Sequence, residues 1–126
     1  MNVMFHTNPP TPSKILAILR QSLDLPPAYF AFLERANGGE GFIGERYVQL
    51  WRAEELVEAN RYYKTGEFFP NFFFIGSDGG GEAYAVKLAE GVSTVFELPF
   101  IGLPSDARVI ASSFEEWLQG PEGQSV

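Results

Sequence analysis

The 126-residue chain contains no cysteine and only one histidine, which excludes several kinds of chemistry. Without thiols the chain can form neither disulfides nor thiolate metal sites, and it has no cysteine nucleophile. His6 lies in the N-terminal stretch before any expected element. No carboxylate or nucleophile at a suggestive spacing accompanies it, as a Ser–His–Asp arrangement would require. We therefore expect no catalytic residue, no cofactor and no metal, and hence no enzyme.

Basic residues are also scarce, because nine Lys and Arg stand against sixteen Asp and Glu, for a net charge of -7. Nucleic-acid binding depends on clustered Lys and Arg, and here they are scattered, so we expect no nucleic-acid partner. An acidic surface serves solubility in many proteins. Complementarity to a basic protein partner is the alternative, and composition alone fits both.

Long apolar segments are missing as well. No segment approaches the ~20 apolar residues that span a membrane. Residues 1–12 lack the basic start and apolar core of a signal peptide. Together with the absence of cysteine, this predicts a cytoplasmic protein that does not bind membranes.

The length predicts a single domain over residues 1–126. Residues 1–11 are expected to be a loose lead-in, and residues 121–126 a frayed tail. Thr11 is expected to cap a first helix, with Pro12 at its first position.

Apolar residues recur at helical spacing in four segments, which predicts four helices. They begin near residues 12, 27, 53 and 113. In the third, acidic residues in the first turn and basic residues in the last match the helix dipole, and Gly66 is expected to end that unit. The fourth has a capping-box pattern in two registers, Ser112 with Glu115 or Ser113 with Glu116.

Strand periodicity alternates with these helices. Strands are expected at residues 42–43, 47–51, 72–75, 84–88 and 92–97, with the apolar segment 72–75 buried on both faces. The connections are short, so the strands should pair antiparallel. We expect an α+β fold, with a mostly antiparallel twisted sheet of about five or six strands and helices mainly on one side.

The sequence GSDGGG at residues 76–81 is not a phosphate loop. Glu82 and Ala83 follow it in place of the Lys and Ser or Thr of a nucleotide-binding loop, and a strand follows in place of a helix. Asp78 and Glu82 would also repel a phosphate. A sharp turn between strands is the favoured interpretation.

Acidic and aromatic side chains leave two further hypotheses open. A hydrolase or sugar-binding site would need a pair of carboxylates from loop residues, namely Glu40, Glu45, Asp78 and Glu82. Exposed loop acids are the commoner case. Residues 62–70 carry more aromatic side chains than the end of one helix needs to bury, so Tyr62, Tyr63 and their neighbours fit either core packing or a partner surface.

The chain resembles the SUKH superfamily (SMI/KNR-like), which groups bacterial toxin-immunity proteins with fungal cell-wall-assembly regulators. Four segments in the family's order carry the resemblance. They are Leu25 to Gly39 with Tyr29 and Leu33, Glu54-Glu55-Leu56 with Asn60, residues 75–85, and residues 110–118. Two features depart from the family's pattern: Lys87 replaces a frequent acid, and residues 98–108 have no clear counterpart.

The resemblance implies an SMI/KNR-like fold and a protein-binding role, with no catalytic group. It implies an immunity-type protein that neutralises a cognate bacterial toxin, often a nuclease in this family, by binding a basic toxin domain. The alternatives are a regulatory scaffold without toxin inhibition, and the carboxylate-based hydrolase or sugar-binding protein. We expect the partner to contact Glu40, Glu45, Tyr62, Tyr63, Asp78 and Glu82. The oligomeric state is left open.

Overall fold

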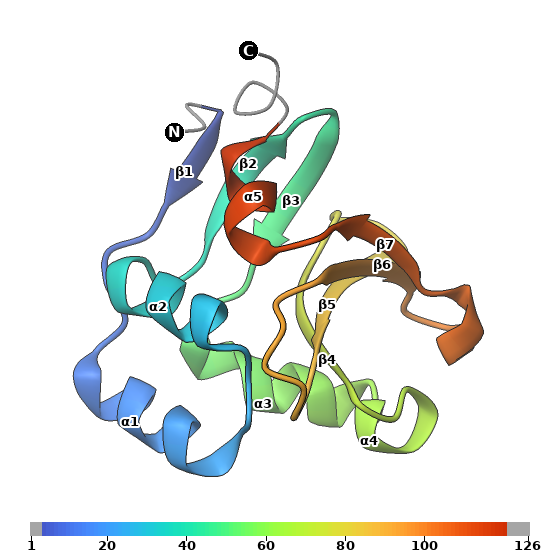
Figure 1. The fold of residues 1–126 in the computed structure, drawn as a ribbon, viewed down its shortest axis with the longest axis horizontal. Helices are drawn as coiled ribbons and strands as arrows, with labels where there is room; N and C mark the ends of the chain where they lie inside the picture. Colours follow the sequence, from blue (N-terminus) through green and yellow to red (C-terminus); the bar gives the residue numbers. More distant parts are fainter. Residues whose placement is uncertain (1–3, 121–126) are drawn as a thin grey trace.

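The computed structural model describes residues 4–120, and seven strands form one antiparallel sheet in chain order (Figure 1). The strands are β1 (Phe5–Thr7), β2 (Gly39–Ile43), β3 (Arg46–Leu50), β4 (Phe72–Ser77), β5 (Glu82–Lys87), β6 (Val95–Pro99) and β7 (Arg108–Ala111). The helices are α1 (Ser13–Ser22), α2 (Pro27–Arg35), α3 (Ala53–Tyr62), α4 (Thr65–Phe68), α5 (Phe114–Gln119) and the 3₁₀ turn η1 (Pro104–Asp106). The α+β class and the antiparallel pairing are confirmed.

The sheet has seven strands instead of the five or six expected, because the sequence does not predict the two short strands at its edges, β1 and β7. β1 pairs with β2, with Phe5 opposite Gly41, so the expectation of a loose lead-in is wrong for residues 5–7. A three-residue strand is too short to show a period in the sequence. Phe5 is buried and holds this edge against the core. At the other edge β7 pairs with β6. The tail at residues 121–126 lies outside the described part of the chain.

Two expected helix boundaries are also wrong. Thr11 is not the cap of α1, because Pro12 occupies the N-cap position and the buried Thr11 hydroxyl has no hydrogen-bond partner in the described chain. Gly66 does not end the third helical unit. Instead α3 ends at Tyr62, Lys64 adopts a left-handed backbone (φ 53°) just before α4, and Gly66 lies within α4. At α5 one of the two capping registers is confirmed, since the Ser113 hydroxyl accepts from the Glu116 N–H at 3.1 Å.

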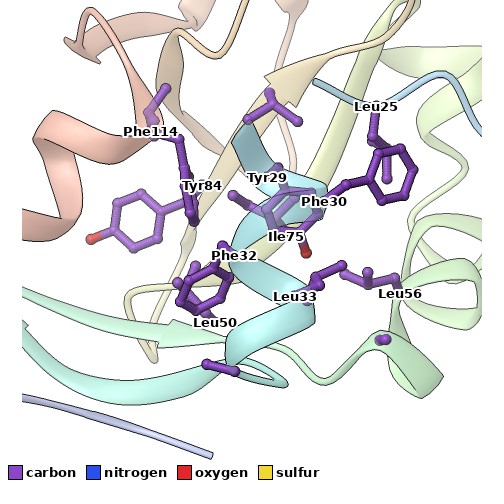
Figure 2. Close-up of a cluster of buried hydrophobic side chains, with 14 of the residues drawn as sticks. Leu25, Tyr29, Phe30, Phe32, Leu33, Leu50, Leu56, Ile75, Tyr84 and Phe114 are labelled. Atoms are coloured by element: carbon purple, nitrogen blue, oxygen red, sulfur yellow. The ribbon is translucent and has the colours of Figure 1, made fainter. Parts of the chain in front are cut away.

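The main core lies between one face of the sheet and the helices α1, α2, α3 and α5, and the sheet curls around α2 and α5 (Figure 1). Figure 2 shows side chains of α2 meeting those of the strands and of α5. Tyr29 and Phe32 each contact the ring of Phe114 edge to face, with centroids 5.3 and 5.2 Å apart. The inward faces predicted for the second and third helices are confirmed, because Tyr29, Leu33 and Leu56 are almost fully buried.

A second core covers the opposite face of β4, β5 and β6. Its buried members are Phe69, Phe72, Phe74, Ala83, Ala85 and Leu98. Every residue of β4 is buried, as the continuous apolar segment predicts. Side chains alternate along a strand, so successive residues enter different cores: Phe74 belongs to the second core and Ile75 to the main one. The short helix α4 contacts β4 and helps to close the second core.

Two asparagines join the elements through their side chains. Asn60, on α3, accepts from the Phe74 N–H at 2.8 Å and donates to the Phe74 carbonyl at 2.9 Å, so it meets β4 as a neighbouring strand would. Asn37 accepts from the Ala53 N–H at 2.6 Å and satisfies one of the donors that the start of α3 leaves free. Both residues lie in segments on which the family resemblance rests, and both are structural here.

Two buried tyrosines provide a matched test of the main core. The Tyr29 hydroxyl is buried without a hydrogen-bond partner in the described chain, whereas the Tyr84 hydroxyl donates to the Tyr47 carbonyl at 3.1 Å. An unsatisfied buried hydroxyl is costly, and a satisfied one contributes about 1 kcal/mol. We expect Tyr29→Phe to raise the free energy of unfolding by about 1 kcal/mol, and Tyr84→Phe to lower it by about 1 kcal/mol. Urea denaturation measures both, and equal losses in the two variants would contradict this account.

Candidate protein-binding surface

Phe100, the first residue after β6, lies at the centre of a row of partly exposed rings. Its ring stacks on Tyr63, with centroids 4.3 Å apart, and on Trp51 at 6.3 Å. Tyr63 in turn meets Tyr62 edge to face at 5.0 Å. We call Tyr62, Tyr63, Phe100 and Trp51 the aromatic row. Its members come from the end of α3, the end of β3 and the segment after β6, so the fold brings together residues far apart in the sequence.

The second core holds the aromatic row in place. Phe74 lies beneath it, with its ring centroid 5.6 Å from that of Phe100 and 6.1 Å from that of Tyr63. The row is therefore the outer rim of that core: Tyr63, Phe100 and Trp51 are half-buried, while Tyr62 is 77% exposed. Their inner faces pack on the core and their outer faces meet solvent, and their role as a partner surface stays a prediction.

The glycine loop, residues 78–81, adjoins the row because the Phe100 N–H donates to the Gly81 carbonyl at 3.0 Å. The loop joins β4 to β5, so its interpretation as a turn between strands is confirmed. The Asp78 carboxylate accepts from the N–H groups of Gly80 and Glu82, at 2.7 and 3.2 Å. The backbone donors that a phosphate would need are thus partly occupied by the loop's own side chain.

A cluster of ion pairs links β3 to β6 and β7. The Glu97 side chain is only 9% exposed and accepts from Arg46, at 3.1 and 3.3 Å, and from Arg108 at 2.6 Å. Burial raises the pKa of Glu97, but the hydrogen bonds and charges of the two arginines outweigh burial and leave the pKa below its usual value. Arg108 also reaches Glu82, at 3.5 Å, beside the glycine loop.

The structure gathers four of the six predicted partner-binding residues around Phe100. Tyr62 and Tyr63 belong to the aromatic row, and Asp78 and Glu82 border it in the glycine loop and at the start of β5. Whether they bind a partner stays a prediction.

The other two predicted residues lie farther from Phe100. Glu40, exposed on β2, accepts a hydrogen bond from the Tyr47 hydroxyl, and the Tyr47 ring would lie 3.8 Å from a Cβ at Gly79, so Glu40 is linked to the glycine loop. Glu45 lies apart. It is in the β2–β3 turn, where it lines a hollow together with residues of β7 and α5.

The outer face of β1, β2 and β3 extends this region as a shallow hollow of about 720 Å³. Its lining includes Trp51 of the aromatic row, together with Tyr47 and Glu40. His6 lines it too. This histidine is not in a loose tail, as the sequence suggested, but in β1 directly opposite Glu40. No group of three or more His, Cys, Asp or Glu that could hold a metal ion occurs within residues 4–120.

The sequence reasoning missed the part played by the segment after β6. Phe100 organises the aromatic row, yet in the sequence residues 98–108 stand out only as a segment without a clear counterpart in the family. Ile101 and Leu103 in this passage are 94% and 64% exposed. The available signal was the presence of three large apolar residues in a segment with no strand or helix period.

Within residues 4–120, none of the helices has the length and apolar character to cross a membrane.

The Glu97 cluster leads to a pH-dependent prediction. Replacing Glu97 with Gln removes the charge shared by two arginines, and we expect the free energy of unfolding to fall by about 2 kcal/mol at pH 7. Since the pKa of Glu97 is lowered by folding, its stabilisation is complete above the unfolded-state pKa of about 4.3 and is lost as the pH falls through the folded-state pKa. The difference between wild type and variant should therefore shrink at pH 3.

Urea denaturation at pH 7 and pH 3 checks this. The control is Glu90→Gln in the exposed β5–β6 turn, which should change the free energy of unfolding by less than about 0.5 kcal/mol at pH 7. A loss for Glu97→Gln that is the same at both pH values would show that the charge of Glu97 does not contribute.

Comparison with known proteins agrees with this architecture. No curated protein sequence matches the chain. The model of the SMI1 / KNR4 family (SUKH-1) matches residues 9–120, which include the helices α1 to α5, the glycine loop and the aromatic row. A match over this much of the chain shows that it belongs to the SMI1 / KNR4 family (SUKH-1).

Proposed function

We propose that this protein is an immunity-type binding protein that neutralises a basic bacterial toxin domain by covering it, and that it does so in the cytoplasm without catalysis of its own. The observation that carries the proposal is the aromatic row bordered by Asp78 and Glu82. We call the four residues of the aromatic row together with Asp78 and Glu82 the Phe100 surface.

The chemistry of the Phe100 surface suits protein recognition. Tyr and Trp supply much of the binding energy at protein interfaces, because they bury a large area with few rotatable bonds. Here the rings are held by the second core before any partner arrives, so little order has to be gained on binding. The neighbouring acids, in a chain of net charge -7, would steer a basic partner toward the rings.

The same acids are poorly placed to act as a hydrolase pair. The Asp78 carboxylate is held by two backbone N–H groups, and Glu82 faces Arg108. A general acid needs a raised pKa and an available proton. Both carboxylates are instead engaged by hydrogen bonds within the chain, which supports a structural and electrostatic role at a binding surface.

Charge reversal at one border of the surface tests the proposal. We expect Glu82→Lys to slow association with the purified toxin domain encoded beside this gene by about tenfold at low salt, because it weakens electrostatic steering. At 0.5 M salt, where exposed charges are screened, the difference from wild type should largely disappear. Stopped-flow kinetics measures the association rate, and thermal melting checks that the fold is retained.

Glu90→Lys is the matched control, since Glu90 is an exposed acid in the β5–β6 turn, at the opposite end of β5 from Glu82. It should change the association rate by less than about twofold. Equal slowing by the two variants would mean that the Phe100 surface is not the place of contact. A wild-type protein that neither binds nor inhibits the toxin domain would refute the immunity role itself.

A further inference from the structure

The 99–107 loop, which runs from the last residue of β6 to the start of β7, presents two large aliphatic side chains to solvent beside the Phe100 surface. Ile101 is 94% exposed and Leu103 is 64% exposed. Single exposed apolar residues are common on protein surfaces. Here two of them share a short loop that begins at Phe100, so the exposed apolar surface continues directly from the aromatic row.

The 99–107 loop is held in one conformation by its own contacts. The Leu103 N–H donates to the Asp106 carboxylate at 2.8 Å, and the Ala107 N–H donates to the Pro104 carbonyl at 3.1 Å. Gly102 lies so close to its neighbours that a Cβ there would approach the Pro99 Cγ to 2.7 Å and the Asp106 Oδ2 to 2.8 Å. A loop folded this tightly, with its aliphatic side chains outside, has little ordering entropy left to lose on binding.

Charged groups of both signs lie in and beside the loop. Asp106 lies within it, and Glu82 is paired with Pro99 across the β5–β6 ladder. The nearby basic group, Arg108, already contacts both Glu82 and Glu97. Within residues 4–120 Asp106 forms no ion pair. An apolar projection beside this acid, in a chain of net charge -7, is complementary to an apolar pocket with a basic rim. A second copy of this chain, which also carries a net charge of -7, would bring acid against acid.

We propose that Ile101 and Leu103 insert into an apolar pocket with a basic rim on the protein partner, and so anchor the complex. This inference rests on the proposed function and adds to it the part of the partner that the loop engages. The Phe100 surface guides the approach through its charges, and the two aliphatic side chains slow dissociation once they are buried.

The test is a double variant, Ile101→Ser with Leu103→Ser, titrated against the purified toxin domain encoded beside this gene. Both side chains are exposed, so the melting temperature should stay within a few degrees of wild type. We expect the dissociation rate, measured by surface plasmon resonance, to rise at least tenfold. The increase should persist at 0.5 M salt, because burial of apolar surface is not screened.

Ile18→Ser is the matched control, because Ile18 is 57% exposed on α1, well away from the 99–107 loop in Figure 1. It should leave the dissociation rate unchanged. If the double variant melts early, Ile101→Ser alone replaces it, since that side chain is almost fully exposed.

Each outcome separates the two proposals. A loop variant that dissociates like wild type, while wild type binds and inhibits the toxin domain, overturns the anchor and leaves the immunity role standing. A wild-type protein that does not bind the toxin domain overturns both. Gel filtration in which wild type is a dimer and the loop variant a monomer would show that the loop meets a second copy, and would also overturn the anchor.

Discussion

The burial of β4 on both faces is the constraint on which the rest of the structure depends. Its large apolar side chains, Phe74 on one side and Phe73 and Ile75 on the other, must each be removed from water. On the side of Ile75 this takes four helices. On the side of Phe74 there is only the short helix α4, the end of α3 and the segment after β6, so the covering layer is thin and its outermost rings remain half-exposed. The candidate binding surface is therefore a consequence of how β4 is buried.

The two halves of the sheet must stay in register for that layer to form. β3 and β4 share only two residue pairs, Gln49 with Ser77 and Leu50 with Gly76. A Cβ at Gly76 would lie 2.3 Å from the Gln49 carbonyl oxygen, so this close approach requires glycine. Beyond the end of that ladder, the Glu97 carboxylate on β6 accepts hydrogen bonds from Arg46 on β3, so an ion pair links these two strands. Gly76, Asn37 and Asn60, which lie in the family's segments, thus shape and join the backbone elements.

The sequence predicted the parts of this fold that rest on local periodicity. The inward faces of the helices, the doubly buried strand and the turn after it follow from apolar spacing and glycine, and all are confirmed. β1 and β7 were missed because three or four residues show no period, and their pairing depends on distant partners. For Tyr62 and Tyr63 the sequence left core packing and a partner surface open, and in the structure Tyr63 is half-buried while Tyr62 is exposed. Their stacking neighbour Phe100 was not identified, because that contact joins residues 37 positions apart and leaves no local pattern.

The central claim is that a protein partner meets this chain at the Phe100 surface and the adjoining 99–107 loop. Hydrogen–deuterium exchange of the complex with the toxin domain that we propose as its partner tests it most directly. The account predicts slower exchange on binding in the glycine loop, in residues 99–107 and at the end of α3, with no change in α1 or in the β5–β6 turn. Protection confined to α1, or to the hollow lined by Glu45 and α5, would contradict it.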